Sequence, residues 1–254
     1  MAGRRTVVVT GGAKGLGRAF AETLGRAGVN VVITGRDATA LALAERELRA
    51  AGAAVEAVVA DITDRAAMAD VVRRAEDAFG VLDVLVNNAG VRGPVGPTWE
   101  IDHDALWRAM EVNVGGTMIA CRAALESMVP RGAGLIVNIV SHAGVHRWPH
   151  ATAYSVSKAA VIKFTENLAV EVRRHGVGVL SYHPGLLDIG LTVEGAKAAT
   201  VGGVWEQRIA AWVEGERAAG RITPVAQATD VLLRLVTSDD NELSGRYITV
   251  DDEA

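Results

Sequence analysis

The chain has 254 residues, of which 50% are hydrophobic and 22% are charged, and its formal net charge is −4. This length and composition fit one globular domain with a sizeable core, and the acidic balance argues against a protein that binds nucleic acid. No apolar run approaches the roughly 20 residues that span a bilayer, and the single cysteine, Cys121, excludes an internal disulfide. We therefore expect a cytoplasmic protein with no membrane partner, and Cys121 as a core thiol on a helix.

Short β-branched runs alternate with longer segments of helical pattern along the whole sequence. Seven of these runs predict strands, at Thr6–Val9, Val29–Thr34, Val55–Val59, Val84–Val86, Leu135–Ile139, Val177–Tyr182 and Tyr247–Val250. They are nearly continuous in apolar residues, which is typical of a sheet covered on both faces. The alternation predicts an α/β fold, a doubly wound parallel sheet of Rossmann type with about seven strands, in a single domain over residues 1–254.

One late segment breaks this alternation. Residues 188–220 hold several glycines around short helical pieces and follow the sixth predicted strand. In an open α/β sheet, ligands bind beyond the carboxyl ends of the strands, which is where this segment is expected to lie. We expect the segment to be a mobile lid over a substrate; a surface excursion without that role is the alternative.

The turn after the first predicted strand is rich in glycine. It reads TGGAKGLG from Thr10 to Gly17. Glycine lets the backbone turn tightly and approach a pyrophosphate, and a helix beginning near Gly15 offers free N–H groups and the positive end of its dipole. The position at the first strand-to-helix junction favours a dinucleotide site over a purely structural turn.

Further motifs follow in order along the chain. They are Asn87-Asn88-Ala89-Gly90 after the fourth strand, Asn113 in MEVNVGG, Ser141, Tyr154 and Lys158 in the pattern Y-x-x-x-K, and Pro184-Gly185 after the sixth strand. Together with the T-G-x-x-x-G-x-G turn, they resemble the motifs of the short-chain dehydrogenase/reductase family in its compact single-domain form. The resemblance covers essentially the whole chain.

Tyr154 and Lys158 lie one helical turn apart, on the same face of a predicted helix. An unperturbed phenol has a pKa of roughly 10, and a nearby ammonium favours the phenolate. The resemblance therefore implies Tyr154 as the general acid/base, with Lys158 lowering its pKa and holding the nicotinamide ribose. It also implies that Ser141 hydrogen-bonds the substrate oxygen and that Asn113 holds a water linked to Lys158.

The same resemblance implies a nicotinamide cofactor. The residues implied as its contacts are Thr10, Gly11, Gly12, Lys14, Gly15, Leu16, Gly17, Arg36, Asp61, Ile62, Asn87, Ala89, Gly90, Tyr154, Lys158, Pro184, Gly185 and Leu187.

The end of the second strand bears on which cofactor is preferred. Relatives that prefer NAD carry an acid there, whereas this chain has Gly35 followed by Arg36. An arginine binds a 2′-phosphate as a charge-assisted fork, and Lys14 is a second cation for that group. The sequence favours NADP(H), with NAD(H) as the open alternative; Asp37 is expected to cap the helix that begins at Ala38.

Three histidines recur every four residues between Ser141 and Tyr154. On one helix they would form a metal-binding face, but Gly144 and Pro149 interrupt the segment, so we predict no metal site. We expect Trp107, at helical spacing, in the core. The substrate pocket is expected to be lined by His142, His146, Trp148, His150 and Trp205.

These observations predict an NADP(H)-dependent oxidoreductase that interconverts a ketone and a secondary alcohol, a ketoreductase acting on a medium-sized, partly apolar small-molecule carbonyl. An epimerase or dehydratase of the extended branch would carry T-G-x-x-G-x-x-G and an extra domain, and this chain has neither. A non-catalytic NADP(H)-binding regulator or scaffold is the alternative. The family resemblance implies a homotetramer, with a dimer as the alternative, although Asp252 and Glu253 replace the glycines of the family's C-terminal motif.

Overall fold

The computed structural model describes residues 4–200, 202–238 and 242–252; Glu253 of the C-terminal motif therefore lies outside the described residues. A seven-stranded parallel sheet forms its centre, in the order β3-β2-β1-β4-β5-β6-β7. The strands are β1 Thr6–Thr10, β2 Asn30–Gly35, β3 Val55–Val59, β4 Val84–Asn87, β5 Gly134–Ile139, β6 Val177–His183 and β7 Tyr247–Thr249. This confirms the predicted doubly wound fold, and each predicted strand end lies within one residue of the observed one.

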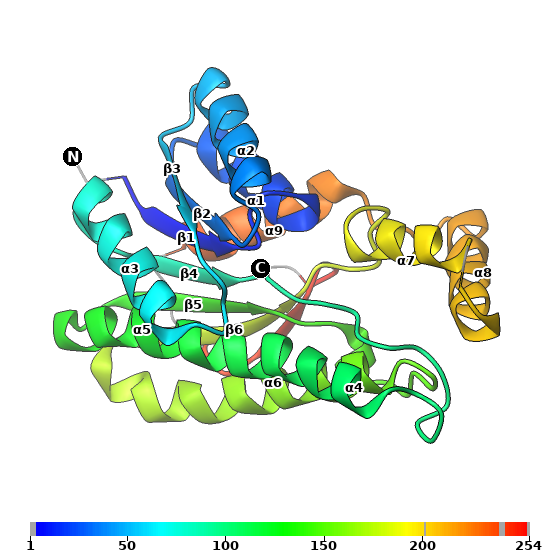
Figure 1. The fold of residues 1–254 in the computed structure, drawn as a ribbon. Helices are drawn as coiled ribbons and strands as arrows, with labels where there is room; N and C mark the ends of the chain where they lie inside the picture. The colour runs from blue at the N-terminus through cyan, green and yellow to red at the C-terminus, as the bar shows by residue number, and fades with distance from the viewer. Residues whose placement is uncertain (1–3, 201, 239–241, 253–254) are drawn as a thin grey trace.

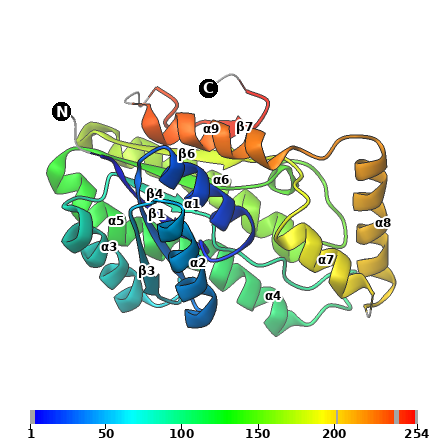
Figure 2. The ribbon, with the colours of Figure 1, turned by 90° about the horizontal axis from the view of Figure 1, so that it is seen from above.

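Helices cover both faces of the sheet (Figures 1 and 2). Their bounds are α1 Gly15–Arg26, α2 Ala38–Ala50, α3 Arg65–Phe79, α4 His103–Met110, α5 Thr117–Arg131, α6 Thr152–Val172, α7 Leu191–Ala199, α8 Val204–Ala218 and α9 Val225–Thr237. A π-helical turn, η1 Glu111–Gly116, joins α4 to α5, and two short 3-10 turns, η2 His142–Gly144 and η3 Arg173–His175, flank α6.

Alternate strand residues belong to two hydrophobic cores, one on each face of the sheet. Val7 and Val9 of β1 pack with side chains of α1, α2 and α9, whereas Val8 packs with side chains of α3, α5 and α6. Successive strand residues point to opposite faces, so a strand buried on both sides must be apolar throughout. For this reason the strands could be recognised in the sequence as continuous apolar runs.

Two predictions about single side chains have different outcomes. Cys121 is buried on α5, as expected. The prediction that Trp107 belongs to the core is wrong, because 57% of this side chain is exposed. Its indole nitrogen donates to His103 one turn earlier on α4, so the ring lies along the outer surface of the helix.

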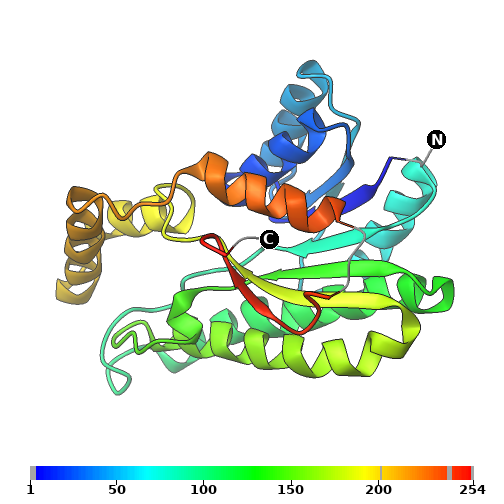
Figure 3. The same ribbon diagram turned by 180° about the vertical axis from the view of Figure 1, so that it is seen from behind.

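The segment over residues 188–220 lies beyond the carboxyl ends of the strands. It contains α7 and α8, which project past the sheet in Figures 1 and 3. Two aromatic pairs join α8 to the loop after β5: Trp148 with Trp212, with ring centroids 5.0 Å apart, and His150 with Trp205, with centroids 3.8 Å apart. None of the helices in the described residues is long and apolar enough to cross a membrane.

Gly17 is the glycine of the first turn for which a side chain has least room. A Cβ at this position would lie 2.3 Å from the Gly11 carbonyl oxygen and 2.5 Å from Asn88 Nδ2. Although alanine favours helices, we expect Gly17→Ala to destabilise the fold by about 1–3 kcal/mol, because the turn must move. Gly215, inside α8, has nothing within 4 Å of such an atom. Gly215→Ala is the control and should stabilise by about 0.5–1 kcal/mol in urea unfolding; equal effects at the two sites would contradict this account.

Candidate active site

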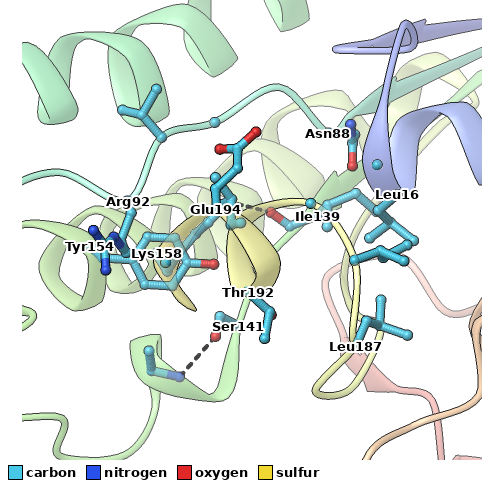
Figure 4. Close-up of a pocket in the computed structure, with 18 of the residues that line it drawn as sticks. Leu16, Asn88, Arg92, Ile139, Ser141, Tyr154, Lys158, Leu187, Thr192 and Glu194 are labelled. Carbon is cyan, nitrogen blue, oxygen red and sulfur yellow. Dashed lines mark hydrogen bonds between the residues drawn. The ribbon is translucent and has the colours of Figure 1, made fainter. Parts of the chain in front are cut away.

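A cavity of about 1510 Å³ lies beyond the carboxyl ends of the central strands. Its wall is formed by the glycine turn after β1, the ends of β4, β5 and β6, and segment 188–220. Parallel sheets bind ligands at this edge, near the point where the strand order reverses, here between β1 and β4. The cavity is therefore the candidate active site, and Figure 4 shows part of its lining.

Most of the predicted site residues line this one cavity. They are Thr10, Gly11, Lys14, Gly15, Leu16, Arg36, Asp61, Ile62, Ala89, Gly90, Ser141, His142, His146, Trp148, His150, Tyr154, Lys158, Pro184, Gly185, Leu187 and Trp205. Four predicted residues lie behind the wall instead, namely Gly12, Gly17, Asn87 and Asn113.

Tyr154 and Lys158 lie in the first two turns of α6. The Lys158 ammonium donates to the carbonyl of Ile139, at the end of β5, over 2.8 Å. It lies 5.7 Å from the centroid of the Tyr154 ring, and no described residue forms an ion pair with it. In Figure 4 both side chains reach into the cavity from the same helix.

The electrostatics of this pair differ from the sequence-based prediction. Burial lowers the pKa of the Lys158 ammonium to about 8. Burial also raises the pKa of the Tyr154 phenol, and a hydrogen bond with Ser141 only partly opposes this rise. The expected lowering is thus wrong for the protein alone, because desolvation of the phenolate outweighs its favourable contacts.

Ser141 joins the same group from the end of β5. Its Oγ accepts from the N–H of Ala143 at 3.2 Å, so the serine caps the short turn η2. The Ser141 hydroxyl lies near enough to the Tyr154 phenol to favour its phenolate, so both hydroxyls face one point of the cavity. A substrate oxygen at that point would meet two donors.

Asn113 lies on the π-helical turn η1, behind the wall. Its amide group donates to the carbonyl of Val91 at 2.8 Å and to Ser157 at 2.9 Å, and its carbonyl oxygen accepts from the N–H of Val91. Ser157 in turn donates to the carbonyl of Tyr154. Asn113 therefore ties the loop after β4 to α6, and π turns inserted in helices often occur at functional sites.

The glycine turn has two kinds of glycine. Gly11 and Gly15 line the cavity with φ angles of +67° and +56°, a region that favours glycine. Gly12 and Gly17 face inward, where a Cβ would lie 2.7 Å from Ile33 or 2.3 Å from Gly11. The first pair leaves bare backbone at the start of α1, which fits a dinucleotide's pyrophosphate; the second pair lets α1 pack close to the sheet.

Asn87 and Asn88 have opposite orientations. The Asn87 amide is buried and donates to Asn138 at 2.9 Å and to the Cys121 sulfur at 3.2 Å. Asn88 lines the cavity, and its amide donates to the Thr10 carbonyl at 2.9 Å. The structure thus corrects the assignment within this pair, since neighbouring residues at a strand end point to opposite sides.

The cations predicted beside a 2′-phosphate both lie at the cavity. Arg36 is 3.8 Å from a carboxylate oxygen of Asp61, and Lys14 is 2.7 Å from Glu194 on α7. All four side chains are substantially exposed. Such exposed pairs are weak and exchange readily for another anion.

Beside His142, which was predicted at the pocket, the cavity wall holds two polar residues that sequence reasoning missed, His183 and Asp251. The rings of His142 and His183 lie against each other, with centroids 4.1 Å apart and planes tilted by 33°, and Asp251 also lines the cavity there. Burial and the neighbouring His142 lower the pKa of His183 to about 4. Pairing of β7 with β6 could have signalled this proximity. Within the described ranges, no group of three His, Cys, Asp or Glu side chains could hold a metal ion.

Comparison with known proteins agrees with this geometry. Residues 5–199 match the family described as short chain dehydrogenase. An uncharacterized oxidoreductase of Staphylococcus saprophyticus is 40% identical over 190 residues, which cover 74% of this chain and 80% of that protein.

Two solved structures share the fold over nearly their full length. Actinorhodin polyketide ketoreductase with NADPH aligns with a TM-score of 0.86 and 27% identity, covering 97% of this chain and 95% of that one. NAD⁺-bound xylitol dehydrogenase aligns with a TM-score of 0.87 and 27% identity, covering 96% of each chain. On its motifs, its fold and these matches, the chain belongs to the short-chain dehydrogenase family of oxidoreductases.

Proposed function

We propose that the protein interconverts a ketone and a secondary alcohol with NADP(H). The observation that carries this proposal is the convergence of Tyr154, Ser141 and Lys158 at one end of the cavity whose other end is the glycine turn. The two solved relatives are named for acting on a polyketide and on xylitol, which fits carbonyl and alcohol chemistry.

The residues of the chain divide the chemistry among them. A nicotinamide cofactor bound in this cavity would supply or accept the hydride. Tyr154 exchanges a proton with the substrate oxygen, and Ser141 donates a hydrogen bond to the same oxygen. Lys158 keeps a positive charge near the phenol, since its pKa of about 8 leaves it largely protonated at neutral pH. Asn113 holds the loop after β4 against α6, which keeps this geometry fixed.

The preference for NADP(H) is supported by two cations at the adenosine end. Arg36 and Lys14 can exchange their exposed carboxylate partners for a phosphate. No acid occupies the end of β2, where Gly35 stands. NAD(H) remains the alternative cofactor, because the two solved relatives hold NADPH and NAD⁺ respectively.

Segment 188–220 is proposed as the substrate lid. Gly190 meets the glycine turn so closely that a Cβ on Gly15 would lie 3.0 Å from its Cα. Closure of such a segment excludes water from the reacting groups. The apolar part of the wall suits a medium-sized, partly apolar substrate.

A homotetramer is proposed from the exposed apolar side chains of neighbouring helices. They are Trp107 on α4, Met118 on α5, and Val156 and Val170 on α6. Sedimentation should therefore give a tetramer, and Val170→Glu, on a side chain that is 76% exposed, should shift it toward smaller species. A monomer in the unaltered protein would overturn the assembly and leave the chemistry unaffected.

Removal of one hydroxyl tests the chemistry. Tyr154→Phe should lower kcat for NADPH-dependent ketone reduction by at least about 100-fold, because the proton donor is lost. NADPH affinity, measured by fluorescence, should stay within about twofold. Tyr182→Phe is the control: this buried phenol donates to the Ala228 carbonyl at 2.8 Å, away from the cavity wall. Normal turnover in Tyr154→Phe, or NADPH binding without turnover of any ketone by the native protein, would favour the non-catalytic alternative.

A second experiment tests the cofactor preference. The native protein should have a higher kcat/KM with NADPH than with NADH. Arg36→Gln should lower the value for NADPH by about tenfold, since a charge-assisted contact is lost, and should change the value for NADH by less than about twofold. A native preference for NADH would show that the proposal is wrong.

A further inference from the structure

We propose that Arg92 binds a carboxylate of the substrate, so that the natural substrates are keto acids and the corresponding hydroxy acids. This inference rests on the proposed function, because it names the substrate class of the same site. The proposed substrate is then an anion: Arg92 would hold its carboxylate, and its ketone would be reduced beside Tyr154.

Arg92 extends from the loop after β4 into the reaction end of the cavity. It follows Gly90 by two positions, and a Cβ on Gly90 would lie 3.8 Å from Lys158 Nζ. Arg92 and Tyr154 line the same cavity, and Figure 4 shows both on the side away from Leu16 of the glycine turn. The guanidinium is therefore positioned at the substrate and not at the glycine turn.

The guanidinium has an unused donor. Its Nη1 is buried and has no hydrogen-bond partner among the described residues, and no ion pair to Arg92 occurs among them. Burial of a charged donor without a partner is costly, so a partner from outside the chain is expected. A ligand anion would supply that partner once α7 shifts from Nη1, because Nη1 has essentially no accessible surface in this structure.

The lid leaves space for this side chain. Gly195 of α7 faces Arg92, and a Cβ there would lie 3.2 Å from Nη1. Any larger residue would press on the guanidinium. The arginine thus lies beneath the lid helix, where partial exclusion of water strengthens a contact with an anion.

Four of the six other lysines and arginines of the cavity wall have side-chain partners; the remaining two are Lys158, described above, and Arg147, which is exposed. The pairs are Lys14 with Glu194 at 2.7 Å, Arg36 with Asp61 at 3.8 Å, Arg221 with Glu216 at 2.6 Å, and Arg208 above the Trp205 ring at 4.6 Å. Arg92 differs from all four in having a buried and unpaired nitrogen. Carboxylate is the group that matches its planar fork, which offers two parallel N–H donors.

Matched pairs of substrates test this assignment. Levulinate and methyl levulinate, and likewise acetoacetate and methyl acetoacetate, carry the same ketone with and without the charge. For at least one pair, the native enzyme with NADPH should have a kcat/KM at least about tenfold higher for the acid. Arg92→Met should lower the value for that acid by about 10- to 100-fold and the value for its ester by less than about threefold.

The control variant is Arg208→Met, which removes an exposed cation from the same wall and should leave the ratio of acid to ester unchanged. The proposal is overturned if the native enzyme reduces esters as well as acids, or if Arg92→Met lowers both equally. It is also overturned if Arg92→Met weakens NADPH binding by more than about tenfold, since the arginine would then serve a cofactor phosphate.

Calorimetry separates this proposal from the reaction itself. If no ketone is reduced, the proposed function fails, and levulinate is titrated into the NADPH-loaded protein. Binding that weakens at least about tenfold in Arg92→Met would still support the anion site. Equal affinities in the two proteins, or no binding to the native protein, would end it.

Discussion

The hydrogen bond from the Lys158 ammonium to the Ile139 carbonyl fixes the geometry on which the site depends. It joins α6 to the last residue of β5 over 2.8 Å. Ser141 follows that residue by two positions and Tyr154 precedes Lys158 by one helical turn, so one contact brings phenol, amine and serine hydroxyl together. A buried ammonium without a carboxylate partner is costly. Its presence in a cavity wall is better explained by chemistry than by stability.

A paired polar layer supports this contact from below. Asn138 on β5 accepts from Asn87 at 2.9 Å and donates to Thr165 on α6 at 2.8 Å. Asn113 adds a second link, from η1 to Ser157 of the same helix. Buried polar groups that satisfy one another hold their elements in a defined arrangement. Helix α6 is therefore held at Ser157, next to the turn that carries Tyr154, and again at Thr165, farther along the helix.

Local sequence patterns predicted the fold and most of the cavity wall, but they did not predict the direction of several side chains. Apolar runs identify strands because both faces of the sheet are covered, and the order of the motifs follows the order of the strand ends. The sequence pattern could not show which of Asn87 and Asn88 points into the cavity, or that Trp107 faces outward. Nor could it give the raised pKa of Tyr154, which depends on burial by segments distant in the sequence. Arg92 lies in no motif, and its significance comes only from its missing partner.

The cations at the two ends of the cavity differ in their exposure and in their partners, so anions would bind there for different reasons. At the glycine turn, Lys14 and Arg36 are exposed and paired, so a phosphate would exchange one weak ion pair for another and gain mainly from geometry. At the reaction end, Lys158 and the Nη1 atom of Arg92 are buried, and neither side chain has a carboxylate partner among the described residues. An anion bound there would supply the partner that these buried donors lack, and it would not have to displace a carboxylate. Gly190 and Gly195 of segment 188–220, the proposed lid, meet the two ends, so a movement of this segment would alter both forms of binding at once.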